Sequence, residues 1–526
     1  MPFTTLAFIL FFAVVFFGYY IVPKRCQWGW LLAASMFFYA YASLFALVFL
    51  VVTIGVSYAA ANWMGRLYAG RDLTVRANKA VWSKVDRKAY KARVATNATR
   101  LLTLSMIVLF GMLGAFKYLQ FAFDNWVRVC GWCGWSVVAP ELGWILPVGL
   151  SFYIFQSVGY LIDVYRETSV PERNFLKHAL FVLFFPQILQ GPIGTYGELA
   201  PQLFEQRDFD RNEASQGLQR VVWGFVKKLC IANRIALLTN SIWDKPDGYS
   251  GCVWWFFISF LYAIQIYADF SGYMDIACGC SQMLGIRLAE NFNCPYFASN
   301  IPDFWRRWHM TLGNWFRDYL FYPLLRSDWS TRLRKMFHSK YLSEMAPTAI
   351  ALAVVWLTTG LWHGASWGYV AWGVYFGFFI ILNLLLEPLR KCFEAKFPRL
   401  TSSRVYALWN IGLTFALVVI GYSIFKPADL GVTWSIWKSS VSSTGVDHLL
   451  YFLRSNKLAL KFIIAGIAVL GIVDTIHHSN PKGFIRNRIC RLPIVCRWGC
   501  YLFAVWCVIF VGKYGAGLNQ FEYFKF

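Results

Sequence analysis

The sequence is poor in acidic residues and in histidine. Its 526 residues include 27 Asp and Glu against 50 Lys and Arg, with only 7 His, so the formal net charge is +23. In a soluble chain this excess would suggest nucleic acid, but no recognised nucleic-acid-binding motif occurs. The basic residues concentrate in short loops between apolar runs, as the positive-inside rule for membrane proteins predicts. The charge therefore indicates a membrane, and we expect no nucleic-acid partner.

Motifs of several common enzymes are also missing. No GxSxG elbow, P-loop or GxGxxG motif precedes a helix, which excludes serine hydrolases, P-loop NTPases and dinucleotide enzymes as first choices. HExxH is absent, and the one CxxC motif, Cys130 to Cys133, has no second pair, so we expect no metal site. The apolar run at 3–22 lacks a basic leading region and an A-x-A-like cleavage site, which favours a retained span over a signal peptide.

Hydrophobic side chains are abundant. They make up 58% of the chain, aromatic residues make up 19%, and charged residues only 15%. Because about 20 apolar residues cross a bilayer, the pattern predicts an all-α integral membrane protein with about 11 transmembrane helices, plus re-entrant and interfacial amphipathic helices. The short run at 175–190 is interrupted by Pro186 and is predicted to be re-entrant. Residues 126–144 and 207–219 are predicted as loops, and 221–238 as an interfacial helix.

One stretch, residues 303–325, combines many charged and aromatic side chains. Its spacing predicts an amphipathic helix with an ion pair between Asp303 and Arg307 at i,i+4. The apolar row of this helix consists of Trp308, Leu312, Phe316 and Leu320. The adjacent row consists of Trp305, His309, Gly313 and Arg317. A simple interfacial anchor would have the same pattern.

Two histidines have apolar surroundings. His309 lies in this stretch, and His363 lies 54 positions later on an apolar span; each follows a tryptophan. An imidazole held among aromatic rings stays neutral near pH 7, which is the form a general base needs. A buried histidine is often only a structural donor, but the pair, together with the intramembrane carboxylate Asp269, favours chemistry. The remaining histidines lie in polar or interfacial contexts: His178, His338, His448, His477 and His478.

The sequence around these histidines reads FWRRWHMTL at 304–312, WFRDYL at 315–320 and GLWHG at 360–364. Further segments in the same order are LPVGLSF at 146–152, GYLIDVYR at 159–166, FPQILQGPI at 185–193, YADFSGYMD at 267–275, NFNCPY at 291–296 and FEYFKF at 521–526. This set resembles the membrane-bound O-acyltransferase (MBOAT) superfamily. Within it, the set is most similar to the alginate O-acetyltransferase branch of bacterial polysaccharide acetylation proteins.

The resemblance implies an O-acyltransferase with no tightly bound cofactor. The donor would be a cytoplasmic thioester, acetyl-CoA or an acyl-carrier protein. The acetyl group would cross the membrane for O-acetylation of an exported polysaccharide, with an extracytoplasmic acetyltransferase as partner. The phrase WHMTLGNWFRD is also close to the relative that moves D-alanine toward teichoic acids, so that alternative stays open. A lipid or glycan transporter is the rival from another class.

The resemblance also assigns roles at the expected site. His363 is expected to be the catalytic base, and His309 to orient the donor or acceptor or to polarise the thioester carbonyl. From their surroundings both are expected to be neutral, His363 because of burial, and His309 also because Arg306, Arg307 and Arg317 lie nearby. The supporting residues are expected to be Trp362, Trp308, Trp305, Asp269, Asn291 and Arg317.

The charge pattern and the resemblance together predict the domain organisation. Residues 1–526 are expected to form a single MBOAT-like membrane domain, with a catalytic core at 146–390 and C-terminal spans at 391–526. Residues 66–100 carry ten basic and two acidic side chains, which predicts a partly helical cytoplasmic loop that touches anionic headgroups. The protein is expected to lie in the inner or plasma membrane, in contact with its lipids. Counting back three spans from this loop places the N-terminus on the extracytoplasmic side.

Overall fold

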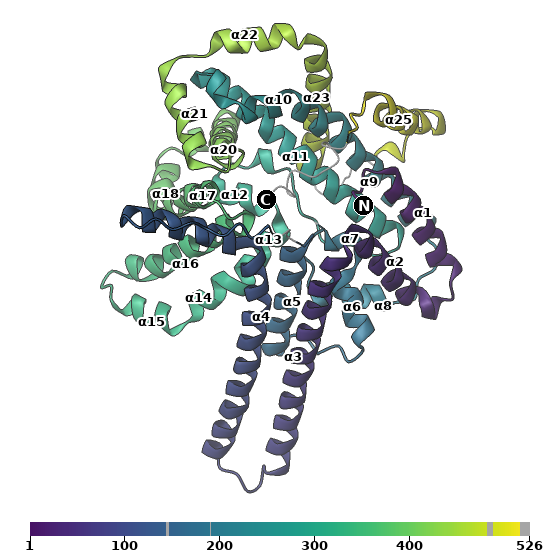
Figure 1. The fold of residues 1–526 in the computed structure, drawn as a ribbon, viewed down its shortest axis with the longest axis vertical. Coiled ribbons are helices and arrows are strands. Elements are labelled where there is room, and N and C mark those ends of the chain that lie inside the picture. Colours follow the sequence, from purple (N-terminus) through teal and green to yellow (C-terminus); the bar gives the residue numbers. More distant parts are fainter. Residues whose placement is uncertain (144–146, 190, 481–487, 516–526) are drawn as a thin grey trace. The chain divides into compact units, whose positions relative to one another are not determined.

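The computed structural model describes residues 1–143, 147–189, 191–480 and 488–515. These residues form helices and connecting turns without a strand (Figure 1), which confirms the all-α prediction. They divide into two compact units. The first comprises Thr5–Ala214 with Met1 and Cys280–Ala289, and the second comprises Ser215–Gly279 and Glu290–Phe526 with Pro2–Thr4. The predicted ending at 521–526, like Trp144, Ile145 and Gln190, lies outside the described residues.

The first unit is built from helices of very different length. They are α1 (Leu6–Ile21), η1 (Lys24–Cys26), α2 (Gln27–Ala42), α3 (Leu44–Ala77), α4 (Lys84–Trp132), α5 (Leu150–Tyr165), α6 (Phe175–Leu183), α7 (Phe185–Ile188) and α8 (Tyr196–Phe204). Since α4 continues to Trp132, the first part of the loop predicted at 126–144 is helical. The predicted re-entrant segment is a broken one, because α6 ends before Phe184 and α7 begins after it.

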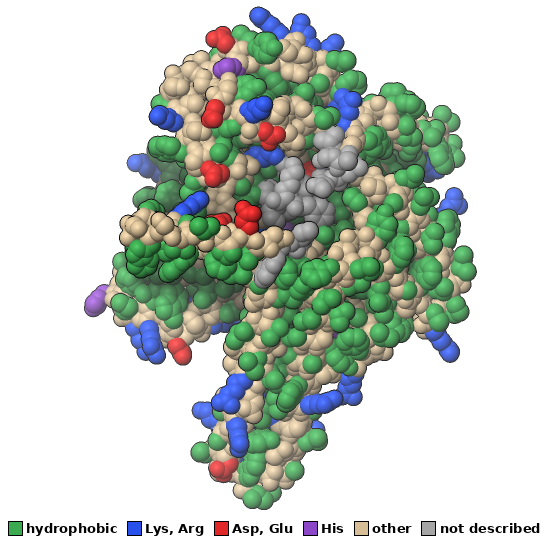
Figure 2. Space-filling view, in the orientation of Figure 1, with side chains coloured by type: hydrophobic (Ala, Val, Ile, Leu, Met, Phe, Trp, Pro, Cys, Tyr) green, Lys and Arg blue, Asp and Glu red, His purple; other side chains and the backbone are tan. Residues whose placement is uncertain are grey.

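Helices α3 and α4 form a long hairpin (Figure 1). About 20 residues cross a hydrocarbon core, whereas α3 has 34 and α4 has 49. The turn between them is capped by Ser83, whose hydroxyl accepts from the Asp86 amide while the Asp86 carboxylate accepts from the Ser83 amide. Residues 66–100 are therefore helical almost throughout, and Lys and Arg side chains project from the distal part of the hairpin, among apolar ones (Figure 2).

His178 lies in a very different environment from the polar one that the sequence indicates. It is fully buried on α6, and its Nε2 lies 2.8 Å from the Ser57 hydroxyl of α3. The rings of Tyr58 and Tyr160 pack beside it. The prediction was wrong because these neighbours come from helices distant in the sequence.

The second unit contains the remaining helices. In its first part these are α9 (Arg211–Phe225, shared with the first unit), the π-helix η2 (Val226–Ala232), α10 (Asn233–Asp244), η3 (Pro246–Gly248), α11 (Cys252–Met283, shared likewise), η4 (Pro295–Phe297), α12 (Ile301–Arg307), α13 (Met310–Phe316), the π-helix η5 (Arg317–Phe321) and α14 (Tyr322–Arg326). Then follow α15 (Asp328–Lys335), α16 (Lys340–His363), α17 (Trp367–Leu385), α18 (Glu387–Lys396), α19 (Pro398–Thr401), α20 (Arg404–Phe425), α21 (Leu430–Ser442), α22 (Val446–Ser455), α23 (Lys457–Ser479), α25 (Ile494–Trp506) and η6 (Cys507–Val511).

Two sequence predictions fail at the start of this unit. Most of the loop predicted at 207–219 is helix α9, which begins at Arg211. The interfacial helix predicted at 221–238 instead carries Lys227 and Lys228 inward, where they pair with Asp275 and Asp269 of α11. A lysine beside apolar residues looks interfacial in the sequence, because its carboxylate partner is not visible locally.

Within the described chain, eight helices are long and apolar enough to cross a membrane: α3, α4, α11, α16, α17, α20, α23 and the continuous α25–η6. Predicted crossings also fall on α1, α2 and α5, which have 16 residues each. Apolar side chains cover much of the visible surface (Figure 2), as contact with lipid requires. The protein is thus a multi-pass membrane protein.

Candidate functional site

The helix predicted over 303–325 is broken at its centre. Helix α12 ends at Arg307 and α13 begins at Met310, and between them His309 adopts φ 47° and ψ 50°. The predicted ion pair between Asp303 and Arg307 is confirmed at 3.1 Å. The predicted row containing both His309 and Arg317 is wrong, because the break turns His309 into the interior while Arg317 is exposed and pairs with Asp318.

Contacts with residues 291–293 cause this break. Phe292 and Trp308 form an antiparallel bridge. The Asn293 amide donates to the Arg307 carbonyl oxygen, and the Met310 amide donates to the Asn291 carbonyl oxygen, each at 3.0 Å. In a continuous helix, the Met310 amide would donate to the Arg306 carbonyl oxygen, and the Arg307 carbonyl oxygen would accept from the Thr311 amide. The bonds to residues 291 and 293 replace these two helical bonds. We call residues 291–294 and 307–311 the clasp.

The clasp also selects the tautomer of His309. The Asn291 Oδ1 atom accepts from the Thr311 amide at 3.0 Å and from the Thr311 hydroxyl at 2.8 Å. A backbone amide can only donate, so the oxygen of the Asn291 side chain must face this turn. His309 Nδ1 lies 3.3 Å from the same oxygen. Nδ1 therefore carries the proton, and the lone pair of the neutral ring is on Nε2.

His309 is held in an apolar shell. Its side chain is buried, with the edge of Phe270 at a centroid distance of 4.8 Å and the Trp362 ring at 6.0 Å. Burial lowers the pKa of His309 to about 3. The low pKa agrees with the predicted neutral form, and burial accounts for it. The three arginines named for this effect are paired with carboxylates, Arg306 and Arg307 with Asp303 and Arg317 with Asp318.

His363 is the last residue of α16, and two glycines beside it let α17 approach. A Cβ atom at Gly360 would collide with the Tyr369 carbonyl oxygen, and one at Gly364 would collide with the Tyr369 ring. The imidazole of His363 is buried against Trp362 and Trp372, with centroid distances of 4.9 Å to both. The glycines of the GLWHG motif thus set the packing around His363.

The structure brings both predicted histidines into contact with one aromatic ring. Trp362 contacts His309 at 6.0 Å and His363 at 4.9 Å between ring centroids. Trp305 packs on Trp372, which in turn contacts His363. Trp308 packs on Phe292 behind the clasp. The site is therefore two imidazoles within a continuous aromatic wall.

The other predicted residues are distributed around this pair. Asn291 bonds within the clasp, as described. Asp269 forms a buried ion pair with Lys228 and directly precedes Phe270, which packs on His309. Arg317 lies on the exposed side of η5.

Sequence reasoning missed several wall residues, namely Phe270, Trp372 and Phe425, and it placed Lys228 at an interface. Phe425 contacts His363 at 5.3 Å. Aromatic residues are so common in this chain that none of these stands out locally. The signal that could have found Lys228 is its need for a buried carboxylate partner.

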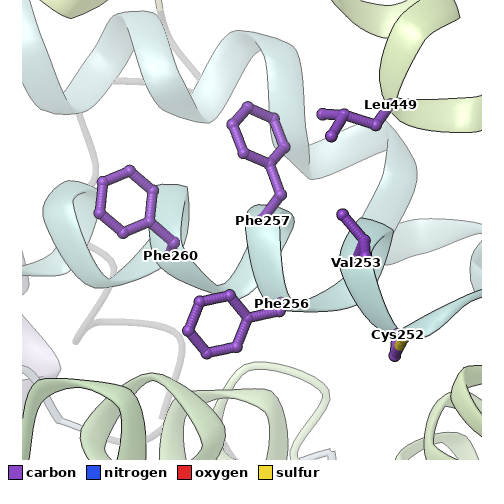
Figure 3. A pocket seen from close by; sticks show the side chains of 6 residues that line it. All are labelled: Cys252, Val253, Phe256, Phe257, Phe260 and Leu449. Atoms are coloured by element: carbon purple, nitrogen blue, oxygen red, sulfur yellow. The ribbon is translucent and has the colours of Figure 1, made fainter. Parts of the chain in front are cut away.

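An apolar pocket of about 520 Å³ lies elsewhere in the second unit, between α11 and α22 (Figure 3). Its lining residues are Cys252, Val253, Phe256, Phe257, Phe260 and Leu449. Neither histidine lines it, and it offers no charged group for chemistry. The site is defined by the histidine pair and not by this pocket.

The fold is that of a multi-pass membrane protein, and its candidate site consists of two buried imidazoles among aromatic rings. Residues 72–425 match the family model described as MBOAT, membrane-bound O-acyltransferase family, and the chain belongs to this family. The protein is accordingly an O-acyltransferase.

Three relatives indicate the range of acceptors in this family. The chain is 33% identical to the probable alginate O-acetylase AlgI of Pseudomonas aeruginosa over 464 residues, which cover 88% of this chain and 78% of the relative. It is 29% identical to the peptidoglycan O-acetyltransferase of Helicobacter pylori, over 94% of this chain and 88% of the relative. It is 31% identical to the teichoic acid D-alanyltransferase of Bacillus subtilis, over 55% of this chain and 70% of the relative.

Proposed function

We propose that the protein moves an acetyl group from cytoplasmic acetyl-CoA across the inner or plasma membrane, for O-acetylation of an exported polysaccharide. The observation that carries this proposal is the arrangement of His309, Trp362 and His363. Both imidazoles contact the Trp362 ring in a buried site, where a thioester and a hydroxyl can react away from water. The similarity to alginate O-acetylases supports acetyl as the transferred group.

In the proposed reaction, His363 is the base. A ring nitrogen of His363 takes the proton from the acceptor hydroxyl as its oxygen attacks the thioester carbonyl carbon. The new C–O bond forms, the C–S bond breaks, and the leaving thiolate takes the proton back from the imidazolium. Because the thioester is already activated, the protein needs to supply a base, orientation and exclusion of water.

His309 has the complementary role of orienting the substrate. With the proton on Nδ1, its Nε2 atom accepts a hydrogen bond from the bound substrate and does not donate one to the thioester carbonyl. Asn291 fixes this tautomer. Trp305, Trp308 and Trp362 exclude water, while Asp269 anchors the helix that carries Phe270.

The donor and the acceptor are proposed to arrive from opposite sides. The basic hairpin of α3 and α4 would face the cytoplasm, with the N-terminus outside, and would attract the phosphates of acetyl-CoA or an acidic carrier protein. On the outer side, an extracytoplasmic acetyltransferase would take the acetyl group and pass it to the polysaccharide.

The test is transfer of radiolabelled acetyl from acetyl-CoA by purified protein in proteoliposomes, with the acceptor polysaccharide and the partner enzyme inside. Folded His363→Ala is expected to transfer no label. Full transfer by that variant would overturn the proposed mechanism. Efflux of glycan that does not depend on any thioester would instead identify a transporter.

D-alanyl transfer toward teichoic acid is the second candidate, and it is favoured by the 31% identity to the Bacillus enzyme. The same proteoliposomes, supplied with a D-alanyl carrier protein in place of acetyl-CoA, distinguish the two. Label transfer from the carrier alone would select D-alanylation.

A further inference from the structure

Asp474 is a carboxylate on the membrane-spanning helix α23, beyond the end of the family match at residue 425. It is buried, with 9% of its surface exposed. A carboxylate inside a membrane span is costly and is retained only where partners compensate for its burial. Its contacts therefore indicate which part of the molecule it serves.

Both contacts lead toward the histidine site. The Tyr267 hydroxyl of α11 donates to Asp474 Oδ2 at 2.7 Å. The Cys294 thiol donates to the Asp474 backbone carbonyl oxygen at 3.4 Å. Cys294 is the last residue of the first clasp segment, so one turn of α23 holds both α11 and the clasp.

The Tyr267 ring is part of the wall behind His309. It lies 6.1 Å from the Trp308 ring and 5.8 Å from the Phe292 ring, between centroids. These two are the bridged residues of the clasp. One turn further along α11, Phe270 packs on His309 itself. A shift of Tyr267 would therefore be passed to both sides of His309.

The clasp needs such support because its backbone is strained. Cys294 has φ 45° and His309 has φ 47°, which is the left-handed region that residues other than glycine rarely adopt. Such residues cost about 1–3 kcal/mol each and persist only where the surrounding structure holds them. Asn291 holds the His309 end, and the backbone carbonyl oxygen of Asp474 holds the Cys294 end. The Asp474 side chain acts on the clasp through Tyr267, which packs on Phe292 and Trp308.

We infer that Asp474 is a positioning residue for acyl transfer, which acts through Tyr267 and the clasp to fix His309. This inference rests on the proposed function of His309. A tether that merely joined α23 to α11 would affect the stability of the protein. A positioning residue affects the rate of transfer, because a displacement of about 1 Å at a reacting group costs up to about 10²-fold in rate.

The test compares Asp474→Leu, Asp474→Asn and Tyr267→Phe with Thr475→Val as control. Thr475 neighbours Asp474, but its hydroxyl bonds only within its own helix, to the Gly471 carbonyl oxygen. Asp474→Leu is expected to lower kcat by about 10–10²-fold with KM for acetyl-CoA unchanged. Asp474→Asn keeps an acceptor for Tyr267 and is expected to restore most of kcat. Tyr267→Phe is expected to resemble Asp474→Leu, and the double variant to be no slower than either.

Hydrogen–deuterium exchange gives a readout that does not require activity. In Asp474→Leu, exchange is expected to speed up at residues 291–296 and 307–311 and to stay unchanged in α16. Unchanged exchange in the clasp would overturn the inference, even if the protein transfers acetyl groups. An equal loss of kcat in Asp474→Leu and Asp474→Asn, accompanied by an equal loss of thermal stability, would also overturn it. If wild-type protein transfers no acyl group, the proposed function fails, while the exchange result still decides whether Asp474 holds the clasp.

Discussion

His309 and His363 have different proposed roles, since His363 is the base and His309 orients the substrate. Only the base must accept a proton during turnover, and losing a general base typically costs about 10²–10⁴-fold in rate. We therefore expect His363→Gln to abolish transfer within that range or beyond. His309→Gln is expected to retain residual activity, because an amide can still make one hydrogen bond to the substrate. Single-turnover acyl transfer at matched amounts of folded protein measures both.

The opposite result would reverse the two roles. The Nδ1–H tautomer of His309 leaves a lone pair on Nε2, so its geometry is compatible with accepting a proton as well as a hydrogen bond. If His309→Gln were inactive while His363→Gln kept most of its rate, His309 would be the base.

Burial of His309 also makes a prediction about pH and stability. Its pKa is about 3 in the folded protein, whereas a histidine in an unfolded chain titrates near 6.5. Between these values the unfolded state binds a proton that the folded state does not, so stability falls as the pH drops below about 6.5. At a pH of about 5 the loss is about 2 kcal/mol.

Thermal unfolding at about pH 7.5 and about pH 5 tests this. The difference in Tm between the two is expected to be smaller in His309→Asn, which has no titratable ring and tolerates the left-handed backbone. His338→Asn removes an exposed histidine and is expected to leave the difference unchanged. An equal pH response in wild type and His309→Asn would contradict the prediction.

At the scale of elements, the close approach of α16 and α17 depends on Gly360. A Cβ atom there would meet the Tyr369 carbonyl oxygen, which is backbone and cannot move aside. We expect Gly360→Ala to destabilise the protein by about 1–3 kcal/mol and to slow acyl transfer, since His363 follows on the same helix. Thermal unfolding in detergent and the transfer rate measure the two effects.

Gly412 on α20 provides the matched control. A Cβ atom there would meet nothing within 4 Å. Gly412→Ala is expected to leave activity unchanged and to gain up to about 1 kcal/mol, from the higher helix propensity of alanine. If both alanine variants behaved alike, the packing of α17 on α16 would not be as tight as described.

At the scale of the whole molecule, protease access to the hairpin of α3 and α4 can show which way the protein is oriented in the membrane. The charged part of α4, from Lys84 to Arg100, is about 25 Å long, whereas a headgroup layer is about 5–7 Å thick. With α4 along the membrane normal, its tip is expected to stand in water, more than a Debye length of about 8 Å from the lipid charge, and only its base to touch headgroups. Trypsin is expected to cleave the tip in inverted vesicles and not in spheroplasts.

A variant with Lys79, Lys84 and Lys88 changed to Gln shows whether the tryptic fragment arises from the hairpin tip. In inverted vesicles of this variant, cleavage at the tip should be lost or reduced. Cleavage in spheroplasts would place the hairpin outside and the N-terminus inside, opposite to the proposed topology.

The features that the sequence predicted correctly are local ones. Apolar runs identify the long spans, the i,i+4 spacing identified the ion pair of Asp303 and Arg307, and the apolar context of His309 and His363 indicated that both are buried. The features that it could not predict depend on contacts between distant segments. The break at Trp308 arises from its bridge to Phe292, and the burial of Lys228 arises from Asp269. The same holds for His178, whose neighbours come from α3 and α5. In each case the neighbouring sequence alone predicted the simpler structure, which was an unbroken helix at Trp308, an interfacial lysine at 228 and a polar surrounding for His178.

The paired charges on η2 and α11 have an electrical consequence. Lys228 pairs with Asp269, Lys227 and Arg220 pair with Asp275, and Arg220 also pairs with Glu290, so these six side chains have no formal net charge. A single uncompensated charge that crossed the membrane would gain or lose about 2.3 kcal/mol per 100 mV. Because the three positive and three negative charges are paired, the transmembrane voltage is expected to do almost no work on this region. The ion pairs between η2 and α11 are therefore expected to add little voltage dependence to the enzyme.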